Sequence, residues 1–191
     1  MVGDVIADAL AHYLTLANDK SRILKFLGMD LSNYFVLTVH RPSTTDNKKS
    51  FGDIMQAAGE LDKQVVFPVH PRTRRHLKAY GIWGSMPKNV ELIDPVGYLD
   101  MIKLMANAEK ILTDSGGVQK EAFILNIPCI TLRETTEWVE TVQSGWNTLV
   151  GVDKDRIVSA AREFSPSTLH KDLFGLGACR KILKYIESRP I

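Results

Sequence analysis

Short apolar segments rich in β-branched residues alternate along the chain with segments in which apolar residues recur at helical spacing. Six apolar runs predict strands, at 34–40, 64–70, 90–94, 110–114, 128–133 and 147–151. Helical patterns separate them, at 51–61, 99–106 and 157–164. Near-continuous apolar strands alternating with helices indicate a parallel sheet covered on both faces. The predicted fold class is α/β, a doubly wound, Rossmann-like parallel sheet of about six strands.

The two ends of the chain follow a different pattern. Residues 4–17 and 19–28 predict two helices before the first strand, and Gly28 closes the second. Residues 164–177 are predicted to form a broken connector. A final helix is predicted after it, with one apolar stripe made of Cys179, Ile182, Leu183 and Ile186.

Composition narrows the classes of protein that the pattern allows. The chain has 191 residues, 45% of them hydrophobic, which suits one or at most two globular domains. The 24 basic and 22 acidic residues give a net charge of +2 and form no block of like charge, so no nucleic-acid partner is predicted. The two cysteines have no metal-ligand spacing, which indicates free thiols in a reducing compartment.

The apolar runs are too short for a membrane span, which needs about 18 residues. Asp4 and Asp8 interrupt the first apolar stretch, which is not typical of a secretory signal. We therefore expect no membrane partner and a cytoplasmic location.

A polar or charged residue stands at the end of five of the predicted strands: His40, His70, Asp94, Asp114 and Arg133. Ligands of an open parallel sheet bind beyond the carboxyl ends of its strands. These side chains therefore predict a binding rim at one edge of the sheet. The alternative is that the strand ends simply reach water. A metal site made of His40, His70 and Asp114 is a further alternative, although no ligand spacing specifies it.

The segment ILTDSGGVQKEAF, residues 111–123, lies on this predicted rim. Gly116 and Gly117 let the backbone approach a ligand closely, and the helix that follows presents free N–H groups that suit phosphate. Ser115 can cap that helix or donate to an anion. Glu121 lies one turn further, on the face of Gly117, where its carboxylate can accept from sugar hydroxyls. An ordinary strand-to-helix turn remains the alternative, and the segment matches neither the ATP nor the NAD fingerprint.

Two other segments carry candidate chemistry. After the first strand, His40 offers an acid, a base or a phosphate donor, and Arg41 offers a planar fork for an anion. After the fifth strand, Trp138 suits either stacking on a ligand or packing. In VHPRTRRH, by contrast, Pro71 is typical of the first residue of a helix, so we interpret that segment as structural.

Five motifs in order, HRPSTTDN, DPVGYLD, LTDSGGVQKEA, RETTEWVET and FGLGAC, resemble those of the non-hydrolysing UDP-N-acetylglucosamine 2-epimerases. The resemblance covers nearly the whole chain, but only the C-terminal half of that family. It implies the second of two Rossmann-like domains in a GT-B type fold, with a UDP-sugar in the cleft between them. It further implies three segments in this chain. Residues 1–30 would be a helical crossover that follows a missing N-terminal domain, residues 31–170 the UDP-binding domain, and residues 171–191 a connector and helix.

The resemblance also implies roles for individual residues. His40 would be catalytic, the diphosphate would lie on the glycine turn, and Glu121 would bind the ribose. The implied UDP-sugar-binding residues are Arg41, Ser115, Gly116, Gly117, Glu121 and Arg133. The implied reaction interconverts UDP-GlcNAc and UDP-ManNAc by eliminating and re-adding UDP, with no metal or other cofactor, and serves cell-envelope polysaccharide synthesis. The carboxylates that move the C2 proton belong to the N-terminal domain, so the chain alone is expected to be inactive.

Two departures from the family pattern affect this interpretation. Ser43 stands where many members have a glutamate linked to regulation, and Trp138 stands where many have an arginine that binds the diphosphate. Arg133 is the expected substitute for that arginine. Substrate identity beyond a UDP-linked N-acetylhexosamine therefore stays open, and a homodimer is implied only for the complete protein. The alternatives are half of a GT-B glycosyltransferase and a stand-alone UDP-sugar-binding subunit.

Overall fold

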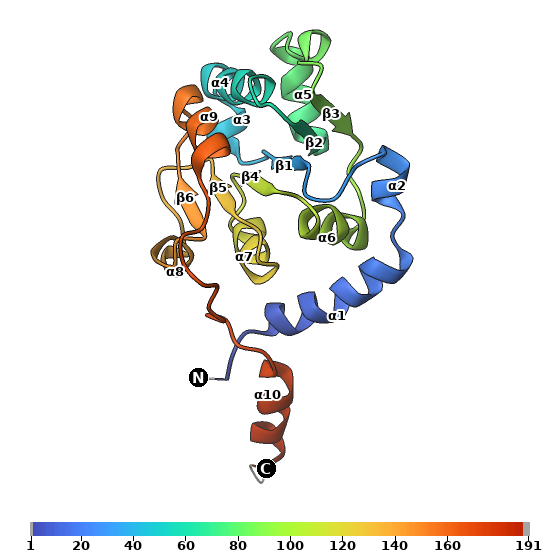
Figure 1. The fold of residues 1–191 in the computed structure, drawn as a ribbon, viewed down its shortest axis with the longest axis vertical. Coiled ribbons are helices and arrows are strands. Elements are labelled where there is room, and N and C mark those ends of the chain that lie inside the picture. Colours follow the sequence, from blue (N-terminus) through green and yellow to red (C-terminus); the bar gives the residue numbers. More distant parts are fainter. Residues whose placement is uncertain (1, 189–191) are drawn as a thin grey trace.

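The computed structural model describes residues 2–188 and contains one six-stranded sheet (Figure 1). The strands are β1 Tyr34–Thr38, β2 Gln64–Pro68, β3 Val90–Ile93, β4 Lys110–Thr113, β5 Cys129–Thr131 and β6 Asn147–Leu149. Their order is β3-β2-β1-β4-β5-β6, and every pairing is parallel. The doubly wound sheet predicted from the sequence is thus confirmed, with each strand one to three residues shorter than expected.

Helices cover both faces of this sheet. The helices are α1 Val5–Lys20, α2 Ile23–Leu27, α3 Pro42–Thr45, α4 Lys48–Gly59, α5 Pro71–Ala79, α6 Tyr98–Ala106, α7 Gly116–Ile124, α8 Val139–Gln143, α9 Lys154–Glu163 and α10 Ala178–Glu187, with a 3-10 turn η1 at Trp83–Ser85. One apolar core joins β1 and β2 to α4, α5 and α9, and the other joins β1 and β4 to α2, α6 and α7. Figure 1 shows these two layers on opposite sides of the strands.

Strand β1 shows why the central strands are mostly apolar. Its five residues are all buried. Phe35 and Leu37 face the α4 layer, whereas Tyr34 and Val36 face the α6 layer. The buried Tyr34 hydroxyl donates to the Leu104 carbonyl at 2.7 Å, which satisfies its polar end. Because successive side chains point to opposite faces, a strand buried on both sides favours apolar residues throughout. The exception is Thr38 at its end, whose hydroxyl lies 2.6 Å from that of Thr113 in β4.

The predicted helix boundaries before β1 were wrong by a few residues. We expected a break near residue 18, but α1 continues to Lys20 and α2 is only Ile23–Leu27. The break falls at Ser21, whose hydroxyl lies 2.6 Å from the Asp100 carboxylate of α6 and accepts from the Ile23 N–H at 3.3 Å. Tertiary contact with α6 therefore sets the boundary. Gly28 closes α2 in a left-handed conformation, as predicted.

Helix α10 forms where the sequence predicts it, and its apolar stripe is largely solvent-exposed. Leu183 and Ile186 are 58% and 61% exposed. Figure 1 shows α10 projecting away from the rest of the molecule. The Asp8 carboxylate of α1 accepts from the Gly177 and Cys179 N–H groups, at 2.6 and 2.8 Å, and so fixes the start of this helix. The ends of the segments expected at 1–30 and 171–191, residues 1 and 189–191, lie outside the described residues.

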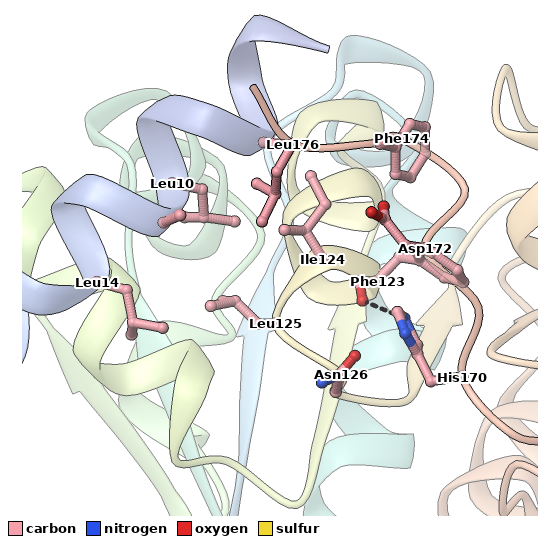
Figure 2. A pocket seen from close by; sticks show the side chains of 12 residues that line it. Leu10, Leu14, Phe123, Ile124, Leu125, Asn126, His170, Asp172, Phe174 and Leu176 are labelled. Carbon is pink, nitrogen blue, oxygen red and sulfur yellow. Dashed lines mark hydrogen bonds between the residues drawn. The ribbon is translucent and has the colours of Figure 1, made fainter. Parts of the chain in front are cut away.

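An apolar pocket of about 300 Å³ lies between α1, the second half of α7 and the connector that precedes α10 (Figure 2). Leu10 and Leu14 form its α1 wall. His170 lies on the connector side, with its Nε2 atom 2.8 Å from the Phe123 carbonyl. None of the residues expected to bind a ligand lines this pocket, which lies at the opposite end of α7 from the glycine turn.

Candidate functional site

Three of the five expected rim residues meet at one stretch of the sheet edge. His40 and Arg133 each follow their strand by two residues, and Asp114 follows β4 directly. Strands β1, β4 and β5 are neighbours, so these residues lie side by side. Between β1 and β4 the strand order reverses direction, and open parallel sheets bind ligands in the crevice at such a point.

Asp114 organises the loop that follows β1. Its side chain is fully buried and accepts from the backbone N–H of His40, at 3.1 Å, and of Arg41, at 2.9 Å. The His40 Nδ1 atom lies 3.8 Å from the Asp114 carboxylate. Sequence reasoning placed Asp114 on the rim but gave it no role in orienting His40. The feature of the sequence that could have indicated this role is a carboxylate at the end of an otherwise buried central strand.

The glycine turn presents an open helix start. Helix α7 begins at Gly116, and Ser115 is its N-cap residue by position but makes no side-chain capping bond, contrary to one of its expected roles. A Cβ built on Gly117 would find its nearest neighbour, the Ser115 hydroxyl, 3.9 Å away. The first turn of α7 is therefore uncovered at Gly117, where its N–H groups and positive dipole end suit an anion.

Arg41 and Arg133 converge beside this helix start, on the carboxylate of Glu137. Arg133 donates to both Glu137 oxygens, at 2.8 and 3.1 Å, and Arg41 donates to one of them at 3.3 Å. The Arg133 hydrogen bonds are the main reason that the pKa of Glu137 falls to about 2, and Arg41 adds a smaller effect. Sequence reasoning predicted both arginines as ligands but did not identify their shared partner.

Trp138 packs instead of offering a free stacking face. Its indole N–H donates to the Gly116 carbonyl at 2.7 Å and so holds the glycine turn. The Lys120 ammonium lies 4.4 Å from the centre of the Trp138 ring, and Phe174 of the connector meets that ring edge to face at 5.8 Å. Lys120, almost fully buried, also pairs with Asp4 at the start of α1. The packing alternative for Trp138 is confirmed.

Glu121 lies one turn beyond Gly117 and is held by Tyr98, the first residue of α6. The Tyr98 hydroxyl donates to the Glu121 carboxylate at 2.8 Å. Burial raises the pKa of Glu121, and the Tyr98 hydrogen bond opposes that rise only in part. The second carboxylate oxygen keeps acceptor capacity for a hydroxyl-bearing ligand.

A recess of about 200 Å³ opens between the β1 loop and the loop before α6. His40 and His70 stand at one side, and Val96, Met101 and Val118 supply apolar walls. It adjoins the glycine turn, because Val118 belongs to the first turn of α7. Together these groups can bind an anion at the helix start and an adjoining ring in the recess.

The remaining expected rim residues, His70 and Asp94, also have roles in local structure. The His70 Nδ1 atom accepts from the Arg72 N–H at 3.3 Å and so caps α5, which starts at Pro71 as predicted. Asp94 pairs with Arg74 and its side chain is 81% exposed. Within residues 2–188, no group of three His, Cys, Asp or Glu side chains is arranged to hold a metal ion, so the alternative site made of His40, His70 and Asp114 is not assembled. None of the helices in this part of the chain is long and apolar enough to cross a membrane.

Comparison with known proteins identifies the family of this chain. The family model described as UDP-N-acetylglucosamine 2-epimerase matches residues 1–187. A UDP-N-acetylglucosamine 2-epimerase homolog of Methanococcus maripaludis is 48% identical over 170 residues, which cover 87% of this chain and 48% of that protein. A UDP-2,3-diacetamido-2,3-dideoxy-D-glucuronate 2-epimerase of Pseudomonas aeruginosa is 40% identical over 97% of this chain and 51% of its own length.

The same relationship appears among solved structures. The crystal structure of Methanocaldococcus jannaschii UDP-GlcNAc 2-epimerase in complex with UDP-GlcNAc and UDP superimposes with a TM-score of 0.86 at 37% identity. The match covers 99% of this chain and 54% of that one. The chain thus spans about half the length of the relatives it matches, and it belongs to the UDP-N-acetylglucosamine 2-epimerase family.

Proposed function

We propose that this chain is the UDP-sugar-binding domain of an epimerase that interconverts UDP-GlcNAc and UDP-ManNAc. The observation that carries the proposal is the convergence of Arg41, Arg133 and the open first turn of α7 at the strand-order reversal. The similar Methanocaldococcus jannaschii enzyme was crystallised with UDP-GlcNAc and UDP, which supports the same ligand class here.

In this proposal the diphosphate lies on the first turn of α7, between the two arginines. In the elimination step the C2 proton is removed, the C1–O bond breaks and UDP leaves. The arginines and the helix N-terminus then bind the charge that builds on the departing diphosphate. Glu121 accepts from the ribose hydroxyls, and His40, oriented by Asp114, acts beside the reacting centre. In the return step, C2 is reprotonated on its other face and UDP adds back to C1.

The other half of the cleft is proposed to belong to a preceding domain, with residues 1–30 as the crossover from it and 171–191 as connector and final helix. That domain would supply the groups that move the C2 proton. Since proximity of reacting groups provides much of the rate of an enzyme, this chain alone should bind without turning over. A homodimer of the complete protein, a cytoplasmic location and a role in envelope polysaccharide synthesis belong to the same proposal.

Calorimetric titration with UDP and incubation with UDP-GlcNAc test this proposal. We expect UDP to bind and no UDP-ManNAc to form with the chain alone. Absence of UDP binding, or full epimerisation by this chain, would contradict the proposal. In a complete protein, UDP-ManNAc formed without an acceptor separates an epimerase from a glycosyltransferase. Since a similar relative is named for a different UDP-sugar, the panel should include UDP-linked diacetamido sugars.

A further inference from the structure

The carboxylate of Glu137 lies where a bound anion would meet the two arginines. It contacts both Nη atoms of Arg133 and one of Arg41. A Cβ built on Gly116 would stand only 3.1 Å from Glu137 Oε2, so the same carboxylate also touches the first residue of α7. One negatively charged group therefore contacts all three positive features of the site.

The helix start beneath this carboxylate has free donors. In the described part of the chain, no acceptor is hydrogen-bonded to the N–H of Gly116 or Gly117. Glu137 thus neutralises the arginines without satisfying the helix start, and a phosphate with more charge and more oxygens can do both. The Glu137 side chain is 51% exposed and precedes α8, so it has room to rotate away.

We infer that Glu137 is an internal counter-anion that occupies the phosphate subsite of the ligand-free chain and is displaced by an incoming diphosphate. The inference rests on the proposed function, because it concerns the same subsite. This displacement would make the phosphate subsite selective among anions. A ligand must outcompete a carboxylate held by two arginines, which a diphosphate does and a singly charged anion does not. Glu137 would therefore keep the subsite closed to weak anions.

Removing this charge should tighten phosphate binding. In Glu137→Gln the side chain keeps its size, loses its hold on the arginines and no longer opposes the ligand. We expect the Kd for pyrophosphate and for UDP to fall about tenfold, as loss of one nearby unit charge predicts for a partly exposed site. Glu137→Ala should give a gain in the same direction, and uridine, which has no phosphate, should show none.

Glu134→Gln is the matched control. Glu134 lies three residues earlier in the same loop, is 71% exposed and pairs with Arg156, which is not part of the site. Its substitution changes the net charge by the same amount, so an effect of overall charge would appear in both variants. We expect pyrophosphate and UDP to bind Glu134→Gln as they bind the unchanged chain.

Calorimetric titration of the folded chain and these variants with pyrophosphate and with UDP tests the inference about Glu137. Tighter binding by both Glu137 variants, but not by Glu134→Gln, supports the inference. Unchanged or weaker binding by both Glu137 variants, while the unchanged chain binds UDP, overturns the inference alone and makes Glu137 a group that positions the arginines. If neither the unchanged chain nor the variants bind pyrophosphate or UDP, the proposed function fails and the inference fails with it.

Discussion

The carboxyl edge of the sheet has two halves that look alike in sequence and differ in structure. Beyond β1, β4 and β5, His40, Arg41 and Arg133 gather around an open helix start. Beyond β2 and β3, His70 caps α5 and Asp94 pairs with Arg74 at the surface. Both halves carry a histidine, an arginine and an aspartate within a few residues of the strand ends.

Topology accounts for the difference between the two halves. The first half flanks the reversal of strand order, where the connections leave in opposite directions and open a crevice. The second half lies towards the β3 edge, where no such reversal occurs. There His70 accepts from Arg72 and lines the recess beside His40, and Asp94 pairs with Arg74 of α5. A polar strand end indicates a ligand site more strongly where it lies beside an open helix start, as Arg41 and Arg133 do.

Substitution of Asp114 and of Asp94 should give the largest difference between the two halves, in the free energy of unfolding. Asp114→Ala leaves two part-buried backbone N–H groups without their charged acceptor, so we expect a loss of about 2–4 kcal/mol in the free energy of unfolding. Asp94→Ala removes an exposed partner of a surface pair and should cost under about 1 kcal/mol. Urea unfolding monitored by circular dichroism measures both. Equal losses would contradict the contrast drawn between the two halves.

The arginines give the next largest contrast. Arg133→Ala should weaken pyrophosphate and UDP binding about tenfold, because a charge-assisted contact to the diphosphate is lost. Arg74→Ala removes an arginine of the β2–β3 half and should leave both affinities unchanged. Titration calorimetry compares the two variants. A loss of affinity in Arg74→Ala as large as that in Arg133→Ala would mean that the ligand spans the whole edge.

A smaller effect on UDP affinity should show which part of UDP lies beside Glu121. Glu121→Gln is expected to weaken UDP binding several-fold, since the amide is a poorer acceptor for ribose hydroxyls, and to leave pyrophosphate binding unchanged. Glu91→Gln, an exposed glutamate of β3, serves as control. A weaker affinity for pyrophosphate in Glu121→Gln would place the diphosphate, not the ribose, beside Glu121.

The same residue predicts a dependence on pH. Because burial raises the pKa of Glu121, its carboxyl group takes up a proton at a higher pH than an exposed glutamate does. The protonated form has lost part of its acceptor capacity, so UDP affinity should decline as pH falls through the raised pKa. Glu121→Gln should lack this decline. UDP titrations at several mildly acidic pH values test it, with pyrophosphate as the ligand that does not contact Glu121.

The sequence predicted the sheet and the glycine turn because both follow from local pattern. Apolar strands buried on two faces and a Gly116–Gly117 helix start are visible without a structure. It did not predict the convergence on Glu137, since Arg41 and Glu137 lie 96 residues apart and meet only through the β1–β4–β5 arrangement. It also placed Asp94 on the binding rim, because a strand end does not reveal that Arg74 will pair with its side chain.

The most direct test of the account is UDP titration of Gly117→Val, with Gly84→Val as its control. A Cβ at Gly117 meets no atom closer than 3.9 Å, and one at Gly84 of η1 meets none within 4 Å, so both variants should fold. Thermal melting by circular dichroism verifies this. The account predicts that Gly117→Val loses measurable UDP binding, because the side chain covers the first turn of α7, whereas Gly84→Val binds normally. Unchanged UDP affinity in a folded Gly117→Val chain would contradict the claim that this turn holds the diphosphate.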